Sequence, residues 1–255
     1  MLILKSAEHF NPAQIANSGQ CFLWKELAPD SYEISAFGKT IVIERSGEDV
    51  TLGCSGEDYE LYWRSYFDID FDYHSCYTAA ICSGFRYLEK AARYSAGIRI
   101  LKQELWETTL SFIISQNNNI PRIRNSIKRV IDRYGHLPEP REITLESLYG
   151  LGLGYRDGYL LNAAESFRSS DFTETLKAAT YAAAKRQLLS IRGIGNKVAD
   201  CICLYGLGHK SAFPRDVWIR RIEEEHFGGH FPDENFAGYS GVLQQYLFYY
   251  GRAAG

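Results

Sequence analysis

The chain has 255 residues, of which 45% are hydrophobic and 23% are charged. This composition is typical of a globular protein with one large or two modest domains, and it excludes a disordered or fibrous chain. No stretch approaches 18 uninterrupted apolar residues, and the apolar residues before Lys5 are too few for a signal peptide. We therefore expect a cytoplasmic protein without a transmembrane segment.

The formal net charge of -3 conceals an uneven distribution of charge along the chain. Residues 1–90 hold 7 Lys+Arg and 14 Asp+Glu (-7), residues 91–222 hold 20 and 12 (+8), and residues 223–255 hold 1 and 5 (-4). A basic segment between acidic ones can attract phosphate backbones even when the whole protein is anionic. Alone, this distribution is a weak sign of a nucleic-acid partner.

The cysteines form neither a CxxC pair nor an evenly spaced framework; they lie at positions 21, 54, 76, 82, 201 and 203. A disulfide scaffold or a zinc finger is therefore not expected, and buried free thiols are the default. Cys201 and Cys203 lie near His209, but ordinary helix packing explains them better than a metal site does. We predict no metal site formed by side chains.

Short runs of β-branched and aromatic residues predict strands at residues 21–24, 32–34, 40–43 and 50–52. Turn residues at 37–39 and 46–49 separate the runs, which favours an antiparallel meander. From about Glu60 onward apolar residues recur at helical spacing. Breaks between helices are indicated at Pro121, at glycines 150, 152 and 154, at glycines 193 and 195, and at Pro214.

These patterns predict an α+β fold. An N-terminal antiparallel β-sheet domain with flanking helices, residues 1–95, is followed by a larger all-helical part, residues 96–255. Loops between the helices are expected to carry the chemistry.

The stretch from Leu189 to Leu204 predicts the end of one helix, a tight turn at Gly193, Ile194 and Gly195, and a new helix. Two glycines allow the backbone to turn sharply, while Ile194 can anchor the turn in the core. Outward-facing amides beside a helix N-terminus are suited to binding a DNA phosphate. A plain turn between helices has the same spacing, so both interpretations stay open.

Lys197 falls in the first turn of the new helix, where the helix dipole disfavours a positive charge. An uncharged amine is what a nucleophilic lysine requires. Nineteen residues later Pro214 is expected to open a helix and to leave Asp216 near its N-terminus, where a carboxylate is stabilised as an anion. Taken singly, a solvated lysine and a first-turn helix acid without a reactive role are the commoner explanations of these residues.

Two further stretches combine side-chain amides, guanidinium groups and an aromatic ring. Residues 115–124 join an apolar helix to a basic one through three successive asparagines, of which capping explains one or two. Residues 151–156 form a glycine-rich loop that presents Tyr155 beside Arg156. A tyrosine is suited to wedging into a base step, and arginine and asparagine are suited to reading base edges.

Together, six motifs resemble the 8-oxoguanine DNA glycosylases/AP lyases of the helix-hairpin-helix glycosylase superfamily, in the family's order and over almost the whole chain. The motifs are residues 17–24 (NSGQCFLW), 115–122 (SQNNNIPR), 151–156 (LGLGYR), 193–203 (GIGNKVADCIC), 214–216 (PRD) and 239–248 (YSGVLQQYLF). The resemblance implies two helical subdomains around a DNA-binding cleft. It also implies excision of 8-oxoguanine opposite cytosine, followed by cleavage of the strand.

By this resemblance, Lys197 would attack C1′ of the flipped-out nucleotide and form a Schiff base. Asp216 would stabilise the positive charge that develops on the sugar and assist proton transfer. The imine would acidify the C2′ hydrogens, so that β-elimination cleaves the strand.

The resemblance also implies a lesion pocket and a group that holds the opposite base. Gln244 would bond the Watson-Crick edge, Phe248 and Cys201 would sandwich the ring, and the Gly19 carbonyl would accept from N7–H, a proton that guanine lacks. Tyr155 would be the wedge, and three residues would hold the orphaned cytosine: Asn117, Arg122 and Arg156.

The implied partner is double-stranded DNA containing oxidised guanine, bound by a monomer without a membrane and, in a prokaryote, associated with the nucleoid. No cofactor is required, although backbone carbonyls of the hairpin, residues 193–195, are a possible cation site. Trp218 departs from the phosphate-contacting histidine usual in eukaryotic members. The absence of a cysteine cluster after the hairpin helix argues against the iron-sulfur relatives. Two alternatives remain: a non-catalytic helix-hairpin-helix DNA-binding module, and a glycosylase for another damaged base.

Overall fold

A computed structural model describes residues 1–5 and 7–254. The chain divides into two compact units, one formed by residues 1–102 and 215–255 and the other by residues 103–214. The predicted boundaries, 1–95 and 96–255, differ from this division in where they place residues 96–102 and 215–255. These residues group with the N-terminal part because helix α14 (Ser240–Ala254) packs against α4 (Tyr73–Ile81) and α5 (Arg86–Tyr94).

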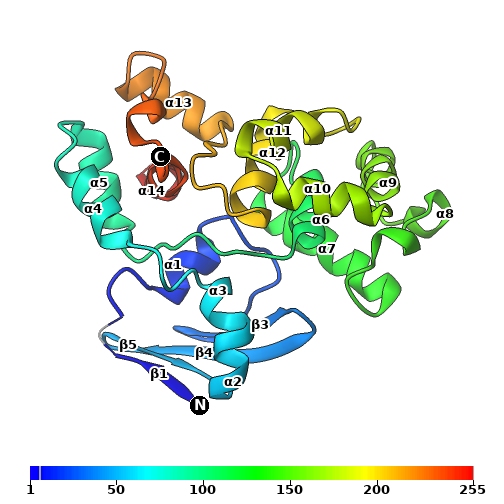
Figure 1. The fold of residues 1–255 in the computed structure, drawn as a ribbon, viewed down its shortest axis with the longest axis horizontal. Coiled ribbons are helices and arrows are strands. Elements are labelled where there is room, and N and C mark those ends of the chain that lie inside the picture. Colours follow the sequence, from blue (N-terminus) through cyan, green and yellow to red (C-terminus); the bar gives the residue numbers. More distant parts are fainter. Residues whose placement is uncertain (6, 255) are drawn as a thin grey trace. The chain divides into compact units, whose positions relative to one another are not determined.

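The first unit contains a five-stranded antiparallel sheet with the order β1-β5-β4-β3-β2 (Figure 1). The strands are β1 (Leu2–Leu4), β2 (Lys25–Ala28), β3 (Ser31–Ala36), β4 (Lys39–Ser46) and β5 (Asp49–Leu52). Buried side chains alternate along β3 and pair across the sheet, with Ile34 opposite Ile41 and Tyr32 opposite Ile43. The predicted antiparallel meander is confirmed for β3 to β5, because this alternation marks one buried face.

Two edge strands differ from the prediction. Residues 21–24 are not a strand; Trp24 is buried and its Nε1 donates to the Tyr66 hydroxyl at 2.9 Å. The hydrophobic run reflects core packing without sheet pairing, and the strand that follows, β2, is exposed along its whole length. Strand β1, which pairs with β5, was also not predicted.

Apolar side chains from several helices pack with the sheet to form one core in this unit. They come from α1 (Pro12–Asn17) and from a continuous helical stretch made of α2 (Gly56–Asp58), a π-helical segment (Tyr59–Trp63) and α3 (Arg64–Tyr66). Ile15, Trp63 and Phe67 are fully buried. The remaining helices are α4, α5, α13 (Val217–His226) and α14, and the Ser95 hydroxyl at the end of α5 donates to the Tyr246 carbonyl at 3.3 Å.

The second unit is helical throughout its regular structure. It contains α6 (Leu105–Ile114), α7 (Ile120–Tyr134), α8 (Leu145–Leu148), α9 (Arg156–Phe167), α10 (Ser170–Ala178), α11 (Tyr181–Leu189) and α12 (Asn196–Cys201), which continues as a π-helical segment (Ile202–Gly206). The glycines at 150–154 and 193–195 separate helices as predicted. Pro121 lies in the first turn of α7, where its missing N–H costs no hydrogen bond.

None of the helices in the described part of the chain is both long and apolar enough to cross a membrane.

Candidate active site

The hairpin between α11 and α12 is anchored by Ile194, which is 4% exposed and whose N–H donates to the Ile191 carbonyl at 3.0 Å. Gly193 has a φ of +102°, and a Cβ at this position would lie 2.3 Å from Cγ of Tyr159. Gly195 has extended backbone with a φ of -94°, and a Cβ there would meet nothing within 4 Å. The fold therefore requires glycine at 193, whereas the exposed Gly195 leaves backbone open to a ligand.

Lys197 lies in the first turn of α12 and is half-buried. Its Nζ donates to the Ser115 hydroxyl oxygen at 3.3 Å and lies 4.9 Å from the centre of the Phe112 ring. The Ser115 hydroxyl donates in turn to the Phe112 carbonyl at 2.8 Å, which leaves its oxygen lone pairs for the amine. The end of α6 therefore holds the lysine amine beside the hairpin.

The three asparagines between α6 and α7 have three different roles. Asn119 caps α7, since its Oδ1 accepts from the Arg122 N–H at 3.0 Å. Asn118 donates to the Ile114 carbonyl at the end of α6 at 3.3 Å. Asn117 has a φ of +46° and donates to the Tyr155 hydroxyl at 3.1 Å. Capping explains two asparagines, and the third points to the glycine-rich loop.

Gln116 connects this turn to both the hairpin and the glycine-rich loop. Its side-chain Nε2 donates to the Gly193 carbonyl at 3.0 Å. Its backbone carbonyl accepts from Arg156 Nε at 2.9 Å and from the Tyr155 hydroxyl at 3.3 Å. The Arg156 guanidinium also lies 4.7 Å from the centre of the Tyr155 ring, which is half exposed. Gln116 lies within the motif at residues 115–122 but was not predicted as a site residue. The signal that could have identified it is its place in a run of side-chain amides.

The second unit therefore connects five of its predicted site residues through the turn at Ser115 to Asn117. The connected residues are Lys197, Gly193, Asn117, Tyr155 and Arg156. Two further predicted residues lie nearby in sequence: Arg122 is exposed in the first turn of α7, and Cys201 is buried at the end of α12.

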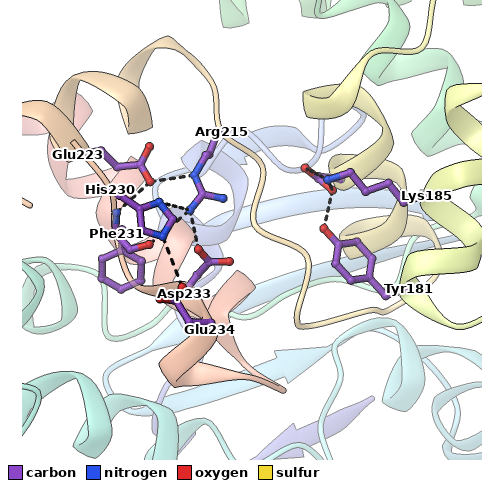
Figure 2. Close-up of polar contacts among 9 residues, drawn as sticks. Tyr181, Lys185, Arg215, Glu223, His230, Phe231, Asp233 and Glu234 are labelled. Atoms are coloured by element: carbon purple, nitrogen blue, oxygen red, sulfur yellow. Dashed lines mark hydrogen bonds and ion pairs between the residues drawn. The ribbon is translucent and has the colours of Figure 1, made fainter.

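An ion pair fixes the two helices of the hairpin to each other. Asp200 on α12 is 5% exposed, and it accepts from the Tyr181 hydroxyl at 2.6 Å and pairs with Lys185 Nζ at 2.8 Å, both on α11 (Figure 2). Because its charge is buried and satisfied by two partners, this pair restricts how α11 and α12 can separate.

Asp216 is the N-cap of α13 in the first unit. Its Oδ1 accepts from the backbone N–H groups of Trp218 at 3.0 Å and Ile219 at 2.9 Å. The predicted position near a helix N-terminus is correct, but the helix begins at Val217 and Pro214 precedes it rather than opening it. The cap fixes the carboxylate and stabilises its anionic form.

Arg215, the residue before Asp216, is held by a network that sequence reasoning missed. Its guanidinium donates to Glu223 Oε1 at 2.8 Å and to Asp233 Oδ1 at 2.5 Å, and Glu223 also accepts from the Phe231 N–H at 3.1 Å. Figure 2 shows Arg215 with Glu223 and Asp233 around it. Glu223 is 4% exposed. These contacts anchor the chain directly before the Asp216 cap.

The other predicted residues of the first unit lie on α14 and after α1. Gln244 is buried and accepts from Gln245 Nε2 at 3.1 Å, whereas Phe248, one turn later, is half-buried. Gly19 follows α1 with a φ of +78°. Arg252 links the two regions, because its guanidinium donates to the Asn17 carbonyl at 3.1 Å and lies 5.4 Å from the centre of the Phe248 ring.

All six cysteines are free thiols; five are buried and Cys82 is exposed. Burial raises the pKa of Cys203 to about 12 and lowers the pKa of His209. Both pKa shifts have the direction expected for side chains packed in an apolar interior. Another buried group is Glu107 on α6, whose pKa is raised to about 8 by burial and, less strongly, by Glu104.

Comparisons with known proteins find similar proteins both by sequence and by structure. Residues 2–109 match the family model described as the N-terminal domain of 8-oxoguanine DNA glycosylase. The N-glycosylase/DNA lyase of Saccharomyces cerevisiae is 37% identical over 158 residues, which make up 51% of this chain and 42% of the yeast protein. The aligned region thus spans less than half of that relative.

Two solved structures are similar over nearly all of the chain. MBOgg1 in complex with a low-affinity DNA ligand has a TM-score of 0.91 at 32% identity, covering 99% of this chain and 96% of its own. The 8-oxoguanine glycosylase/lyase of Clostridium acetobutylicum, bound to double-stranded DNA with cytosine opposite 8-oxoguanine, has a TM-score of 0.91 at 30% identity, covering 99% and 95%.

Proposed function

Because the chain belongs to the 8-oxoguanine DNA glycosylase family, we propose that it is a bifunctional DNA glycosylase/AP lyase that removes 8-oxoguanine opposite cytosine. The substrate is double-stranded DNA, from which the damaged nucleotide is flipped out before its glycosidic bond is broken. The predicted α+β fold with a helix-hairpin-helix motif agrees with the fold of these relatives.

Lys197 is the proposed nucleophile. Its amine attacks C1′, the bond between C1′ and N9 breaks, and the base leaves with the bonding electrons. Opening of the sugar then gives an imine between Nζ and C1′. Loss of a C2′ proton expels the 3′ phosphate, which cleaves the strand by β-elimination.

The single observation that carries this proposal is the position of the Lys197 amine. It is half-buried at the start of the hairpin helix and oriented by the Ser115 hydroxyl oxygen, 3.3 Å away. A lysine whose only role was to bind phosphate needs no fixed orientation, whereas a nucleophile must be held at one position beside the reacting atom. The position therefore favours the enzyme over the non-catalytic DNA-binding module.

Asp216 is the proposed stabiliser of the positive charge on the sugar. Two backbone N–H groups hold its Oδ1 in place, and the Arg215 network anchors the residue before it. A fixed carboxylate stabilises a developing cation without having to reorganise during the reaction.

Two groups of residues are proposed to select the substrate. Tyr155 fills the gap left by the flipped nucleotide, while Asn117, Arg122 and Arg156 hold the cytosine. Gly19, Cys201, Gln244 and Phe248 bind the lesion. An acceptor at N7–H would be left unpaired by guanine, at a cost of about 1–3 kcal/mol. The amine chemistry needs no cofactor, and a cation at the hairpin carbonyls remains a prediction.

Borohydride trapping tests the proposal directly. Incubation with duplex containing 8-oxoguanine opposite cytosine, followed by borohydride, is expected to link the enzyme covalently to DNA. Lys197→Gln abolishes the adduct, whereas Lys177→Gln, at an exposed lysine paired with Glu174, retains it. Binding without trapping in the unmodified protein would favour the DNA-binding module, and trapping only with another damaged base would change the substrate.

A further inference from the structure

Three side chains of the first unit direct their metal-binding atoms toward one another, and none of the three is among the residues proposed for catalysis. Glu8 and His9 lie between β1 and α1, and His74 lies in the first turn of α4. The ligand atoms of all three lie within 4.8 Å of one another. We propose that Glu8, His9 and His74 form a binding site for a divalent transition metal ion of the Zn²⁺ type. This inference is independent of the proposed function.

The protonation of the His9 ring suits a metal ligand. Its Nδ1 lies 2.8 Å from the Ala96 carbonyl oxygen, an atom that can only accept a hydrogen bond. Nδ1 therefore carries the proton, and in the neutral ring Nε2 presents a lone pair. A hydrogen bond from the second ring nitrogen to a backbone carbonyl is the usual support for a histidine that binds metal.

The separation of the two histidine nitrogens fits one shared ion. His9 Nε2 and His74 Nδ1 are 3.4 Å apart. Two nitrogens bound at about 2.0–2.1 Å with a nearly tetrahedral angle are separated by about 3.4 Å. Glu8 Oε2 lies 3.8 Å from His74 Nδ1, and its side chain is 78% exposed, so a small rotation brings it to the same distance. Three protein ligands would leave one position for water.

The backbone that carries the two rings is anchored on both sides. The His9 carbonyl accepts from Arg99 Nε at 3.0 Å, and the Asn11 N–H donates to the Gly97 carbonyl at 2.8 Å. On the other side, Asp72 caps α4 through the Ser75 N–H at 3.0 Å. The exposed side chains of Glu8 and His74 must be ordered on binding, whereas the His9 ring is already held by the Ala96 carbonyl, which limits the entropic cost.

A second cluster of potential metal ligands has a similar composition and can be compared with the first. His230, Asp233 and Glu234 also lie close together. However, the Arg215 guanidinium is 3.4 Å from His230 Nδ1 and 2.5 Å from Asp233 Oδ1, so a cationic side chain already contacts two of these three residues. The structure therefore favours the Glu8 cluster as the metal site.

Metal binding is tested with Zn²⁺ and Co²⁺ on the chelator-treated full chain. Titration with Zn²⁺ against a chromogenic indicator should give one site per chain, and Co²⁺ should produce the visible absorption of a low-coordinate complex. We expect His74→Ala to weaken Zn²⁺ binding at least about tenfold, because loss of a hydrogen bond that merely supports a ligand already costs that much. Glu8→Gln should weaken it less, because the two imidazoles remain.

Matched variants separate this site from other ligands. His230→Ala removes the second cluster and Cys82→Ser removes the exposed thiol, and both should bind Zn²⁺ like the unmodified protein. Thermal unfolding without metal should be unchanged in His74→Ala, whose side chain is 69% exposed. The proposal is wrong if the unmodified chain binds no stoichiometric Zn²⁺, if His74→Ala binds as well as it does, or if His230→Ala or Cys82→Ser loses the site.

Discussion

The two glycines of the hairpin should respond to the same substitution in opposite ways. Gly193→Ala is expected to destabilise the fold, whereas Gly195→Ala should leave the fold intact and weaken DNA binding. The difference follows from the backbone. Gly193 has a φ of +102° and no room for a Cβ, while Gly195 has a φ of -94° and open space beside it.

The size of the effect at position 193 follows from two terms. Holding alanine in a sparsely populated backbone region costs about 1–3 kcal/mol. Its Cβ would also meet Tyr159 atoms at 2.3, 2.5 and 2.6 Å, so the ring and α9 must shift, which adds about 1–3 kcal/mol. We expect a loss of about 2–6 kcal/mol in total, a large share of the stability of a typical domain. At position 195 only the weaker N-cap preference is lost, about 1 kcal/mol or less.

Urea unfolding followed by circular dichroism measures the first quantity, and fluorescence anisotropy with undamaged duplex measures the second. Gly195→Ala should lower DNA affinity at constant salt, because its methyl group covers backbone proposed to face phosphate. Equal destabilisation by the two substitutions would refute the structural reasoning. Unchanged DNA affinity in Gly195→Ala would instead remove the exposed face of the hairpin from the DNA interface.

Three further outcomes can be measured. Glu223→Gln removes one of the two carboxylates that pair with Arg215, so it should cost about 1–3 kcal/mol in unfolding free energy. It should also slow single-turnover base excision without weakening DNA binding, and an unchanged excision rate would separate this network from Asp216. Burial raises the folded pKa of Glu107 to about 8 from 4.5, so the folded state keeps a proton that the unfolded state releases. The contribution of this group to stability is therefore greatest below pH 4.5 and falls as pH rises to about 8. Glu107→Gln should flatten that decline in melting temperature between pH 5 and 8, and a parallel decline would contradict the assignment. Gln244→Ala should slow excision of 8-oxoguanine more than it weakens binding to undamaged duplex, and equal losses would exclude Gln244 from the lesion pocket.

Local patterns in the sequence predicted the parts of the fold that local forces determine. Strands β3 to β5 were recognised because one face of each is buried, which imposes a period of two on their side chains. Strand β2 gave no such signal, since all four of its residues are exposed and its pairing with β3 provides its structure. The apolar run at residues 21–24 was wrongly predicted as a strand, because its residues are buried without pairing in the sheet. Their burial comes from packing and from the Trp24 to Tyr66 hydrogen bond.

The residues of the candidate site also differ in whether the local sequence identifies them. Glycine spacing and a first-turn lysine are visible in a short window, so the hairpin and Lys197 could be selected from the sequence. Gln116 could not, because its amide reaches the Gly193 carbonyl 77 residues away. Glu223 likewise acquires significance only when folding buries it against Arg215 and the Phe231 N–H. From the sequence, a charged or amide side chain is expected on the surface unless its distant partner is known. The residues that position a site are therefore harder to predict than those that carry its chemistry.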